Sequence, residues 1–387
     1  MFLAMRLVLL VLLSFAWTEA FDVTEGFHHH ANETTDVSSL EFKEIARKTY
    51  SKVLPCVEGA WMYSDKKPTI DWQFPDDAQQ HFEEILRVTE PYRQVSVHEY
   101  AGYEGPWIEN MFISKFMHLP LHRYRGMIPI FVQWIDSQIL RGRLFGNLNN
   151  ALNGVLRPNV LYLAISQGDA GLSFIGTSHP NILVMSAGGF GHIPIPLIKG
   201  ELPLQPHPEN FDFDLGFYGN PRQHPREEML PFLRQRSGEM GLKYNQAQGG
   251  DWLHDMNRTK YNLAPRGYGR SSFRFAECIQ MGRMPVFIYD DMPWIPFMST
   301  NLSLETFGFV MRKSNDGQEN LEQVLSAIKN TTEPEYREKL VHLLSIRSHF
   351  TYRGVFRQIM MFLHDPFGAD GGHLRCTYHA RNQFCCG

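Results

Sequence analysis

Polar and apolar positions alternate at helical spacing near the beginning of the folded part of the chain. Residues 38–41 have the spacing of a capping box and precede Phe42, so a helix is predicted to begin there. A second amphipathic helix is predicted after Pro75, and Pro91 ends it because proline cannot continue a helix.

The middle of the chain has a different pattern, with short continuous apolar runs instead of amphipathic ones. Residues 160–166 and 182–186 are such runs, and Gly-rich or acidic residues follow each of them. Strands that are buried on both faces have this pattern, which indicates a parallel sheet with helical crossovers. The Pro-rich residues 193–208 are predicted to link this half of the chain to a second one.

The second half repeats the pattern of strands and helices. A strand is predicted over residues 211–218 and a basic helical segment over 222–236. A strand–loop–helix–strand unit follows, and its parts are predicted at residues 260–264, 265–270, 271 or 272 to 281, and 284–289. Such a βαβ unit places its glycine-rich loop at the carboxyl edge of a parallel sheet, where α/β folds bind ligands.

Composition limits the classes of protein that fit this pattern. The chain has 387 residues, 43% of them apolar, and a formal net charge of −4. At about 150 residues per domain, this length predicts two domains. The near-neutral charge excludes a dedicated nucleic-acid binder, and the body has no apolar run of about 20 residues, which excludes a multi-span membrane protein.

The first 20 residues have the form of a secretory signal peptide. Arg6 precedes an apolar stretch over residues 7–17, and small residues stand at Thr18 and Ala20. An uncleaved membrane anchor is the alternative, and the protein contacts a membrane only in that case. Either way the body is expected in the lumen of the secretory pathway (Golgi or ER) or outside the cell, after a flexible polar segment at residues 21–37.

Sequons and cysteines agree with that location. Four N-x-S/T sequons predict glycosylation at Asn32, Asn257, Asn301 and Asn330. The five cysteines include no CxxC pair, so a zinc site is not indicated. Cys56 is expected to pair with the C-terminal cysteines (Cys376, Cys385 and Cys386), whereas Cys278 is expected to be a small buried residue.

The glycine-rich loop has the chemistry of an anion site. Gly267 and Gly269 allow close approach of the backbone, and the start of the helix offers free N–H groups. Arg266 and Arg270 add guanidinium groups that match phosphate oxygens. The loop is not a P-loop, because no Lys-Ser/Thr follows the glycines, and its spacing does not fit a dinucleotide fingerprint.

The first turns of the helix extend the site. Ser271 and Ser272 offer hydroxyl donors, and Glu277 lies on the order of 8 Å along the helix, at a distance that suits the hydroxyls of a ribose. Together these residues indicate a nucleoside diphosphate. The alternative is a tight turn followed by a simple ion pair between Arg274 and Glu277 on the surface of the helix.

These motifs resemble the C-terminal signature of exostosin-like proteins, glycosyltransferase family 47. The matching residues are Pro265-Arg266-Gly267, Ser272-Phe273-Arg274, Glu277, Gly282-Arg283-Met284-Pro285-Val286 and Asp290. Looser matches upstream are Phe217-Tyr218-Gly219-Asn220 with Arg226, Ile130-Phe131-Val132, and residues 181–192. The resemblance covers residues 95–365, and it departs at Ala264, where the family commonly has Cys.

The resemblance implies an inverting, metal-independent glycosyltransferase with two Rossmann-like domains that face a cleft, the glycosyltransferase B architecture. Residues 38–200 would bind the acceptor glycan, residues 201–365 would bind a nucleotide sugar, usually a UDP-sugar, and residues 366–387 would form a tail. No bound cofactor is implied, and a complex with other glycosyltransferases fits the family.

The resemblance also implies roles for individual residues. Arg226 and Arg266 would neutralise the diphosphate, with Ser271 and Ser272 as donors, and Glu277 would hold the ribose. Gly267, Arg274 and Asp290 belong to the same donor motif.

The general base of an inverting transferase should come from the first domain and face the cleft. The candidates are Glu104, Glu109, Asp136, Asp169 and His192, and the first three in order of preference are Glu109, Glu104 and Asp169. His192 either contacts substrate or caps a turn, and Trp294 either forms an aromatic wall for a sugar or packs in the core.

Two other functions compete with the active transferase. One is a non-catalytic relative in the lumen that binds a glycan or a partner protein. The other is an unrelated α/β hydrolase, which is disfavoured because no Gly-x-Ser-x-Gly motif occurs in the chain.

Overall fold

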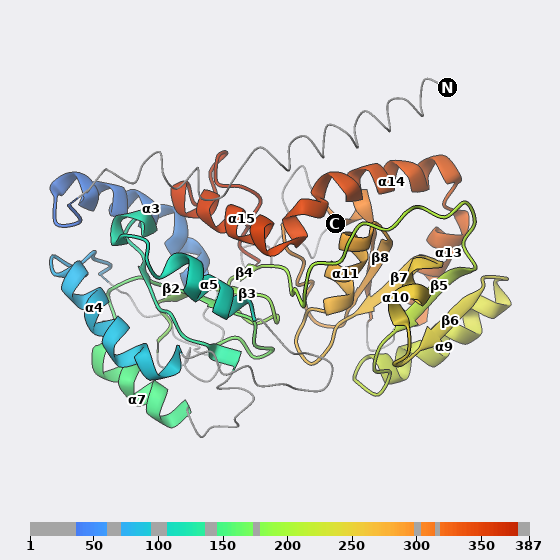
Figure 1. The fold of residues 1–387 in the computed structure, drawn as a ribbon, viewed down its shortest axis with the longest axis horizontal. Coiled ribbons are helices and arrows are strands. Elements are labelled where there is room, and N and C mark those ends of the chain that lie inside the picture. The colour runs from blue at the N-terminus through green and yellow to red at the C-terminus, as the bar shows by residue number, and fades with distance from the viewer. Residues whose placement is uncertain are drawn as a thin grey trace.

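The computed structural model describes residues 36–59, 71–93, 107–135, 145–172, 179–297, 303–313 and 318–377. These residues form two α/β halves that lie side by side (Figure 1). Both sheets are parallel, so the predicted fold of two Rossmann-like domains is confirmed.

The N-terminal half is built on a four-stranded sheet in the order β1-β2-β3-β4. All residues of β2 and β3 are buried, as the continuous apolar runs predict, because helices cover the sheet. Its elements are α3 (Leu40–Gly59), α4 (Ala78–Thr89), η1 (Glu90–Tyr92), α5 (Ile108–Phe116), η2 (Leu121–Tyr124), β1 (Ile128–Pro129), α7 (Phe145–Val155), β2 (Tyr162–Ser166), β3 (Ile182–Ser186) and β4 (Ile193–Pro194).

The C-terminal half is built on a five-stranded sheet in the order β6-β5-β7-β8-β9. Its elements are β5 (Phe213–Tyr218), α9 (Arg226–Glu239), β6 (Tyr244–Ala247), α10 (Trp252–Asn257), β7 (Thr259–Pro265), α11 (Phe273–Met281), β8 (Met284–Tyr289), α12 (Leu304–Phe307), β9 (Phe309–Arg312), α13 (Gln318–Asn330), α14 (Glu333–Ile346), η3 (Arg347–Phe350) and α15 (Tyr352–His364).

The end of the chain returns to the N-terminal half, which corrects the predicted boundary at residue 365. Helix α15 packs on α5 and η2, and the rings of Phe116 and Phe356 lie 5.6 Å apart. A disulfide joins Cys56 in α3 to Cys376, as expected for these cysteines, and Cys278 is buried and free. The apolar face of α15 is covered by the first half, so the two halves are tied together by packing and by a covalent bond.

The first helix and the Pro-rich linker are both present, but each differs in detail from the prediction. Helix α3 begins at Leu40, and the Ser39 hydroxyl accepts from the Phe42 N–H at 3.1 Å, so Ser39 rather than Ser38 caps it. The Pro-rich segment begins with the short edge strand β4, where a proline is tolerated. Strand β1 lies at Ile128–Pro129, just before residues 130–132, which are among the looser matches to the family.

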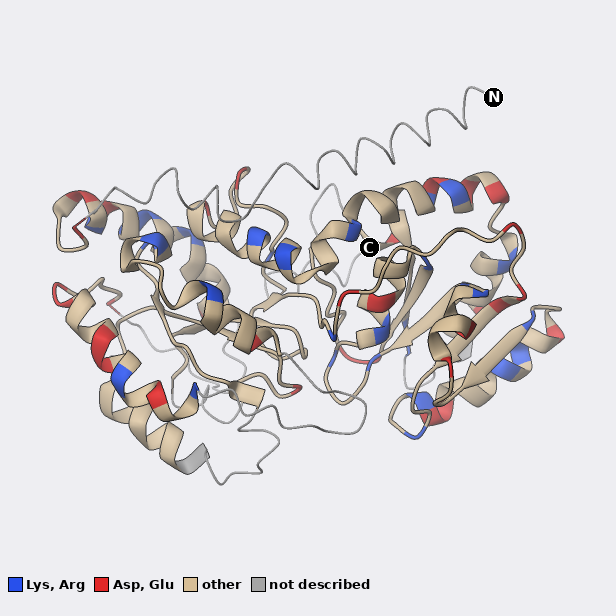
Figure 2. Cartoon of the chain, in the orientation of Figure 1, with Lys and Arg blue, Asp and Glu red and all other residues tan. Residues whose placement is uncertain are grey.

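Charged side chains of both signs are distributed over the outer helices (Figure 2), in keeping with the small net charge. Within the described ranges, no helix is both long enough and apolar enough to span a membrane. The predicted leader and the polar segment at residues 21–37 lie almost entirely outside those ranges.

Candidate functional site

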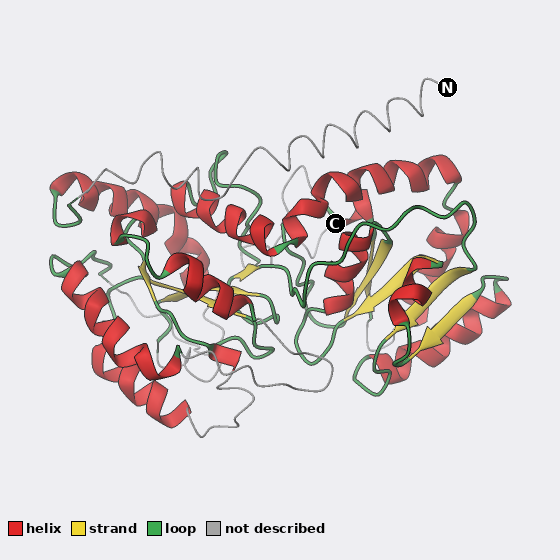
Figure 3. Cartoon of the chain, viewed as in Figure 1, coloured by secondary structure: helices red, strands yellow, loops and turns green. Residues whose placement is uncertain are grey.

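The candidate site lies at the carboxyl ends of the strands, where loops from the two halves meet between the sheets (Figure 3). In the C-terminal sheet the order of the strands reverses between β5 and β7. Such a switch point leaves a crevice between the loops that follow the two strands, and α/β proteins bind ligands there. The loops at this place are residues 219–225 and 266–272, and the second is the predicted anion loop.

Arg226, at the beginning of α9, holds these two loops together. Its Nε donates to the carbonyl of Arg266 at 3.0 Å, its Nη2 to that of Pro265 at 3.1 Å, and its Nη1 to that of Asn220 at 3.2 Å. Burial, together with the nearby charge of Arg274, lowers the pKa of Arg226 to about 10. Arg226 therefore fixes the width of the crevice and places a positive charge beneath the anion loop.

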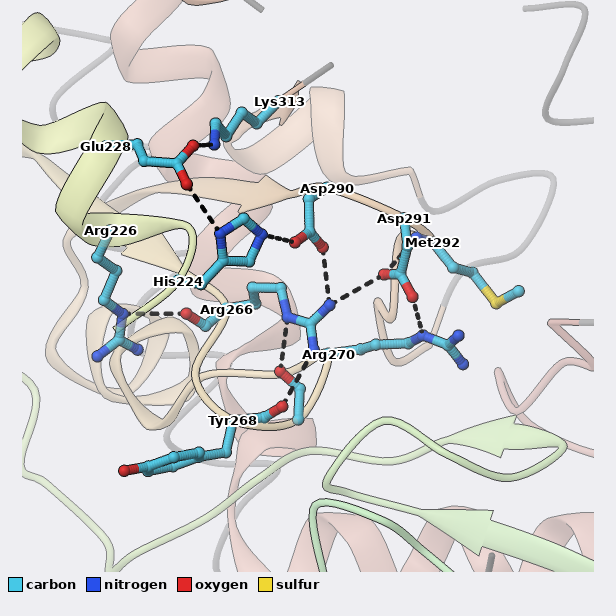
Figure 4. Close-up of polar contacts among 11 residues, drawn as sticks. His224, Arg226, Glu228, Arg266, Tyr268, Arg270, Asp290, Asp291, Met292 and Lys313 are labelled. Atoms are coloured by element: carbon cyan, nitrogen blue, oxygen red, sulfur yellow. Dashed lines mark hydrogen bonds and ion pairs between the residues drawn. The ribbon is translucent and has the colours of Figure 1, made fainter. Parts of the chain in front are cut away.

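The Arg266 guanidinium is paired with two acids that follow β8 (Figure 4). Its Nη1 lies 2.7 Å from Asp290 Oδ1 and 3.3 Å from Asp291 Oδ1, and the same side chain donates to carbonyls of its own loop. Burial opposes ionisation of Asp290, but the hydrogen bond and charge of Arg266 outweigh it, so the pKa of Asp290 lies below its ordinary value. Arg266 thus shapes the loop and is neutralised by Asp290 and Asp291.

Local sequence pattern does not predict the network that surrounds these acids. His224 lies between Asp290 and Glu228, at 3.0 and 3.2 Å, and Glu228 pairs with Lys313. Figure 4 shows this chain of contacts from α9 to the end of β8. These contacts hold the loop after β5 and the beginning of α9 against the loop after β8. Sequence pattern alone does not reveal them, because the loop after β8 is far in sequence from the other two segments.

Arg270 connects the anion loop to the other half of the molecule. Its Nε lies 2.7 Å from Asp291 Oδ2, its Nη1 donates to the Gly189 carbonyl at 3.2 Å, and its guanidinium lies 4.1 Å from the centre of the Phe190 ring. The loop after β3 therefore lies directly against the loop after β7. The two carboxyl edges face each other, as the predicted architecture requires.

Two glycines allow this close approach. A Cβ atom on Gly269 would lie 1.9 Å from the Gly188 carbonyl oxygen and 2.9 Å from Asp169 Oδ1. Gly189 has a φ of +124°, and a Cβ there would lie 2.3 Å from the Arg270 nitrogen. A larger residue at either place would push the two halves apart.

The beginning of α11 supplies hydrogen-bond donors that have no partner. Ser271 and Ser272 are 8% and 7% exposed, and within the described parts of the chain their hydroxyls make no hydrogen bond. The Ser271 carbonyl accepts from the Gly267 N–H at 3.0 Å, which holds the loop closed beside the helix. Unpartnered hydroxyls at a helix N-terminus, next to arginines, favour an anionic ligand.

Glu277 lies on α11, one turn after Phe273, and is 5% exposed. Arg274 Nη1 lies 2.8 Å from Glu277 Oε2, although the contact lacks hydrogen-bond geometry, and Arg274 also stacks on Trp252 at 4.0 Å. Burial raises the pKa of Glu277, against the opposing charges of Arg274 and Lys199. The ion pair between Arg274 and Glu277 that the sequence offered as the alternative is therefore present, but it is buried and not on the surface of the helix. The Oε2 atom of Glu277 has no hydrogen-bond partner in the described structure.

The prediction that Glu109 faces the cleft is wrong. Glu109 is fully buried, and its two oxygens accept from the N–H groups of Gln167 at 2.7 Å and Ile135 at 2.9 Å. The carboxylate thus ties α5 to the chain after β1 and β2. Asp169 follows β2, is partly exposed and approaches Gly269 of the anion loop, whereas Glu104 and Asp136 lie outside the described residues.

The side chains of His192 and Trp294 both form hydrogen bonds with the backbone. His192 Nδ1 accepts from the Val184 N–H at 3.0 Å, and burial lowers the pKa of His192 to about 4, against a hydrogen bond with the Val57 backbone. Trp294 is 1% exposed and donates to the Ser186 carbonyl at 2.9 Å. Trp294 therefore forms no exposed wall for a sugar, because its ring packs between the halves.

The described sequons differ in accessibility. Asn330 is exposed at the end of α13, whereas Asn257 is partly buried and its side-chain oxygen accepts from the buried Arg283. Asn32 and Asn301 lie outside the described residues. Among the residues that the structure describes, no group of three His, Cys, Asp or Glu side chains is placed to hold a metal ion.

Neither a protein-family model nor a curated protein sequence matches the chain. Among solved structures, the chain is similar to the pneumococcal O-GlcNAc transferase GtfA in complex with UDP and GlcNAc. The identity is 11%, the match covers 53% of this chain and 45% of that chain, and the TM-score is 0.34.

It is also similar to TarM, at 9% identity, with 57% of this chain and 58% of that chain covered and a TM-score of 0.29. A third similar structure is Arabidopsis thaliana UGT89C1 complexed with quercetin. The identity is 12%, the match covers 66% of this chain and 76% of that chain, and the TM-score is 0.28. The chain spans about half the length of the first two of these proteins. Likenesses of this size carry no argument about function, and membership of the exostosin-like family stays a prediction.

Proposed function

We propose that this chain is a glycosyltransferase that moves a sugar from a nucleotide sugar, with UDP-sugars as the first candidates, to a glycan acceptor in the secretory pathway. The observation that carries the proposal is the pair of unpartnered hydroxyls of Ser271 and Ser272, two residues that are 8% and 7% exposed at the beginning of α11. They lie at the switch point of the sheet, in a loop that Arg226 supports and Arg270 joins to the opposite half.

The donor diphosphate is proposed to bind at this loop. The Ser271 and Ser272 hydroxyls and the helix N–H groups would donate to its oxygens, and the charge of Arg226 lies beneath the loop. Arg266 and Arg270 are paired with Asp290 and Asp291, so their guanidinium groups would exchange those carboxylates for phosphate oxygens when the donor binds. Glu277 would accept from the hydroxyls of the ribose.

Transfer with inversion is a single displacement. The acceptor oxygen forms a bond to the anomeric carbon as the bond from that carbon to the diphosphate oxygen breaks, and the electron pair leaves with the diphosphate. The acceptor's proton passes to a base. Asp169 is the strongest described candidate, because it belongs to the first domain and lies beside the anion loop.

A second function, binding of nucleotide or glycan without turnover, is favoured by two observations. Both arginines of the anion loop are already neutralised by Asp290 and Asp291, and Glu109 is committed to the backbone. Incubation of the protein with UDP-, GDP- and ADP-sugars and acceptor glycans, followed by ¹H NMR of the anomeric proton, separates the two functions. Release of nucleoside diphosphate with an inverted linkage supports the transferase, whereas saturable binding without any product supports the binding protein.

A further inference from the structure

Charged side chains of alternating sign form a continuous series of contacts from the anion loop to the end of β9 (Figure 4). We call this series the charge chain. Its members, in order, are Arg270, Asp291, Arg266, Asp290, His224, Glu228 and Lys313. The proposed donor site uses the first four members. It assigns no role to His224, Glu228 and Lys313, although they are joined to it directly.

His224 is the member of the charge chain whose charge changes near neutral pH, because histidine titrates between about pH 5 and pH 8. Its side chain is 58% exposed, so solvent can supply the proton. The ring lies between two carboxylates, with Nε2 3.0 Å from Asp290 Oδ2 and Nδ1 3.2 Å from Glu228 Oε1. A neutral ring donates from one nitrogen only, whereas an imidazolium donates from both. Only the charged ring can therefore donate a hydrogen bond to both carboxylates.

The charges of the chain balance while His224 is neutral. Its other members are three arginine or lysine side chains and three carboxylates, so their formal charges sum to zero. A bound diphosphate brings further negative charge to the same place. Protonation of His224 is the change within the chain that offsets part of that charge without any movement of the backbone.

Asp290 is shared between Arg266 and His224, which contact different oxygens of its carboxylate. Arg266 Nη1 lies 2.7 Å from Oδ1, and His224 Nε2 lies 3.0 Å from Oδ2. In the proposed function Arg266 exchanges Asp290 for a phosphate oxygen. That exchange leaves a carboxylate that is only 17% exposed without its arginine, which is unfavourable unless another cation replaces it.

We propose that His224 takes up a proton from solvent when the diphosphate binds, and that the resulting imidazolium holds Asp290 in place of Arg266. Glu228 stays paired with Lys313, so it keeps the other side of the ring in place. His224 is thus a positioning residue, which acts on the donor through Asp290 and Arg266. The inference rests on the proposed donor site and adds the regulation of that site by pH.

Diphosphate binding and protonation of His224 favour each other, and the coupling is equal in both directions. A charged ring lowers the cost of releasing Arg266 from Asp290, so a protein that is already protonated binds the donor more tightly. The contribution of His224 to donor affinity should therefore increase as the pH falls through the range in which histidine titrates.

The test is isothermal titration calorimetry of UDP with the full chain at about pH 7 and about pH 8. Each titration is run in HEPES and in Tris, whose ionisation enthalpies differ, so the difference in heat gives the number of protons taken up. His224→Gln removes the titrating ring, and Asp290→Asn removes the carboxylate that the ring is proposed to hold. His254→Gln is the matched control, because that side chain is also 58% exposed and also lies beside an acid, Asp255. Subtraction of one protein from another cancels protons that UDP itself exchanges.

We expect the wild type and His254→Gln to take up at least about 0.3 proton more than His224→Gln at one or both pH values. Asp290→Asn should lose the same extra proton, since the ring then has no carboxylate to receive from Arg266. The wild type should also bind UDP at least about threefold more tightly than His224→Gln at about pH 6.5, and this advantage should shrink as the pH rises to about 8.5.

Equal proton uptake by the wild type and His224→Gln at both pH values would overturn the inference. So would an equal loss in His254→Gln, or full uptake in Asp290→Asn, because the proton would then not belong to the pair of His224 and Asp290. Failure of the folded wild type to bind UDP would instead refute the proposed donor site, so the two failures are distinguishable. Circular dichroism of each variant confirms that it is folded.

Discussion

The guanidinium of Arg270 lies 4.1 Å from the centre of the Phe190 ring, and this pair joins the two halves of the molecule at their carboxyl edges. Arg270 belongs to the predicted anion loop and Phe190 to the glycine-rich turn after β3. The same arginine pairs with Asp291. The loop that is proposed to hold the donor is thus shaped by contacts from both halves.

Arg270→Ala should lower the free energy of unfolding by about 2 kcal/mol, because it removes a cation–π contact, an ion pair and a hydrogen bond from a partly buried place. Urea unfolding measures this loss. Arg337→Ala, which breaks an exposed pair within α14, should change the value by less than about 0.5 kcal/mol. Equal effects of the two variants would show that the Arg270 contact does not join the halves.

Glu277→Gln should stabilise the protein at neutral pH while it weakens nucleotide binding. Burial raises the pKa of Glu277 above its ordinary value of 4.5, so the ionised form is disfavoured in the folded state. The stability that protonation contributes is present below pH 4.5 and is lost as the pH rises through the folded-state pKa. The gain from the neutral amide should therefore appear near pH 7 and disappear below pH 4.5.

Unfolding curves of wild type and Glu277→Gln at several pH values check this prediction, and a UDP titration accompanies them. A variant that is less stable at pH 7 would mean that the ion pair with Arg274 outweighs the cost of burying the carboxylate. Unchanged UDP affinity would remove Glu277 from the donor site.

His192 should make the protein less stable as the pH falls from 6.5 to about 4. Burial lowers the pKa of His192 to about 4, so over this range the unfolded chain binds a proton that the folded chain does not. The stability contributed by the neutral ring is complete above pH 6.5. It is lost as the pH falls, at up to about 1.4 kcal/mol per pH unit.

Because His192→Gln removes this titration, it should flatten the dependence of the unfolding free energy on pH between 6.5 and 4. His364→Gln, at an exposed histidine at the end of α15, serves as the control and should leave the slope unchanged. A slope that is the same in both variants would contradict a His192 that stays neutral in the folded protein.

Reduction of the disulfide between Cys56 and Cys376 should lower the stability of the protein. Cys56 and Cys376 are separated by 320 residues, and a crosslink that closes so long a loop is worth about 2–5 kcal/mol. Dithiothreitol should lower the unfolding midpoint of the wild type but not that of a Cys56→Ala/Cys376→Ala variant. If the reductant acts equally on both proteins, the bridge contributes nothing to stability.

The sequence predicts the parts of this fold that depend on local pattern. Strands β3 and β8 lie at the predicted residues, because a continuous apolar run ended by polar residues is a strong local signal. The anion loop and the beginning of α11 are also predicted by a local signal, because glycines and serines mark the turn between β7 and the helix.

Other features depend on contacts between distant segments and leave little local signal. Glu109 has the sequence surroundings of a loop acid, but the ends of β1 and β2 close over it and supply two N–H donors. The pairing of Arg266 with Asp290 and Asp291 arises only when the ends of β7 and β8 lie side by side. The packing of α15 on the first half cannot be predicted from its sequence either, because an amphipathic pattern does not indicate which surface will cover the apolar face.

The most direct test of the central claim is a UDP titration of the wild-type protein and of a Ser271→Ala/Ser272→Ala variant. Ser345→Ala, in which the lost hydroxyl donates only to the carbonyl of His342 within its own helix, is the matched control. We expect UDP to raise the unfolding temperature of the wild type and of the control, and we expect the double variant to bind UDP at least about tenfold more weakly. Equal binding of UDP by all three proteins, or no binding by the folded wild type, would contradict the donor site at the beginning of α11.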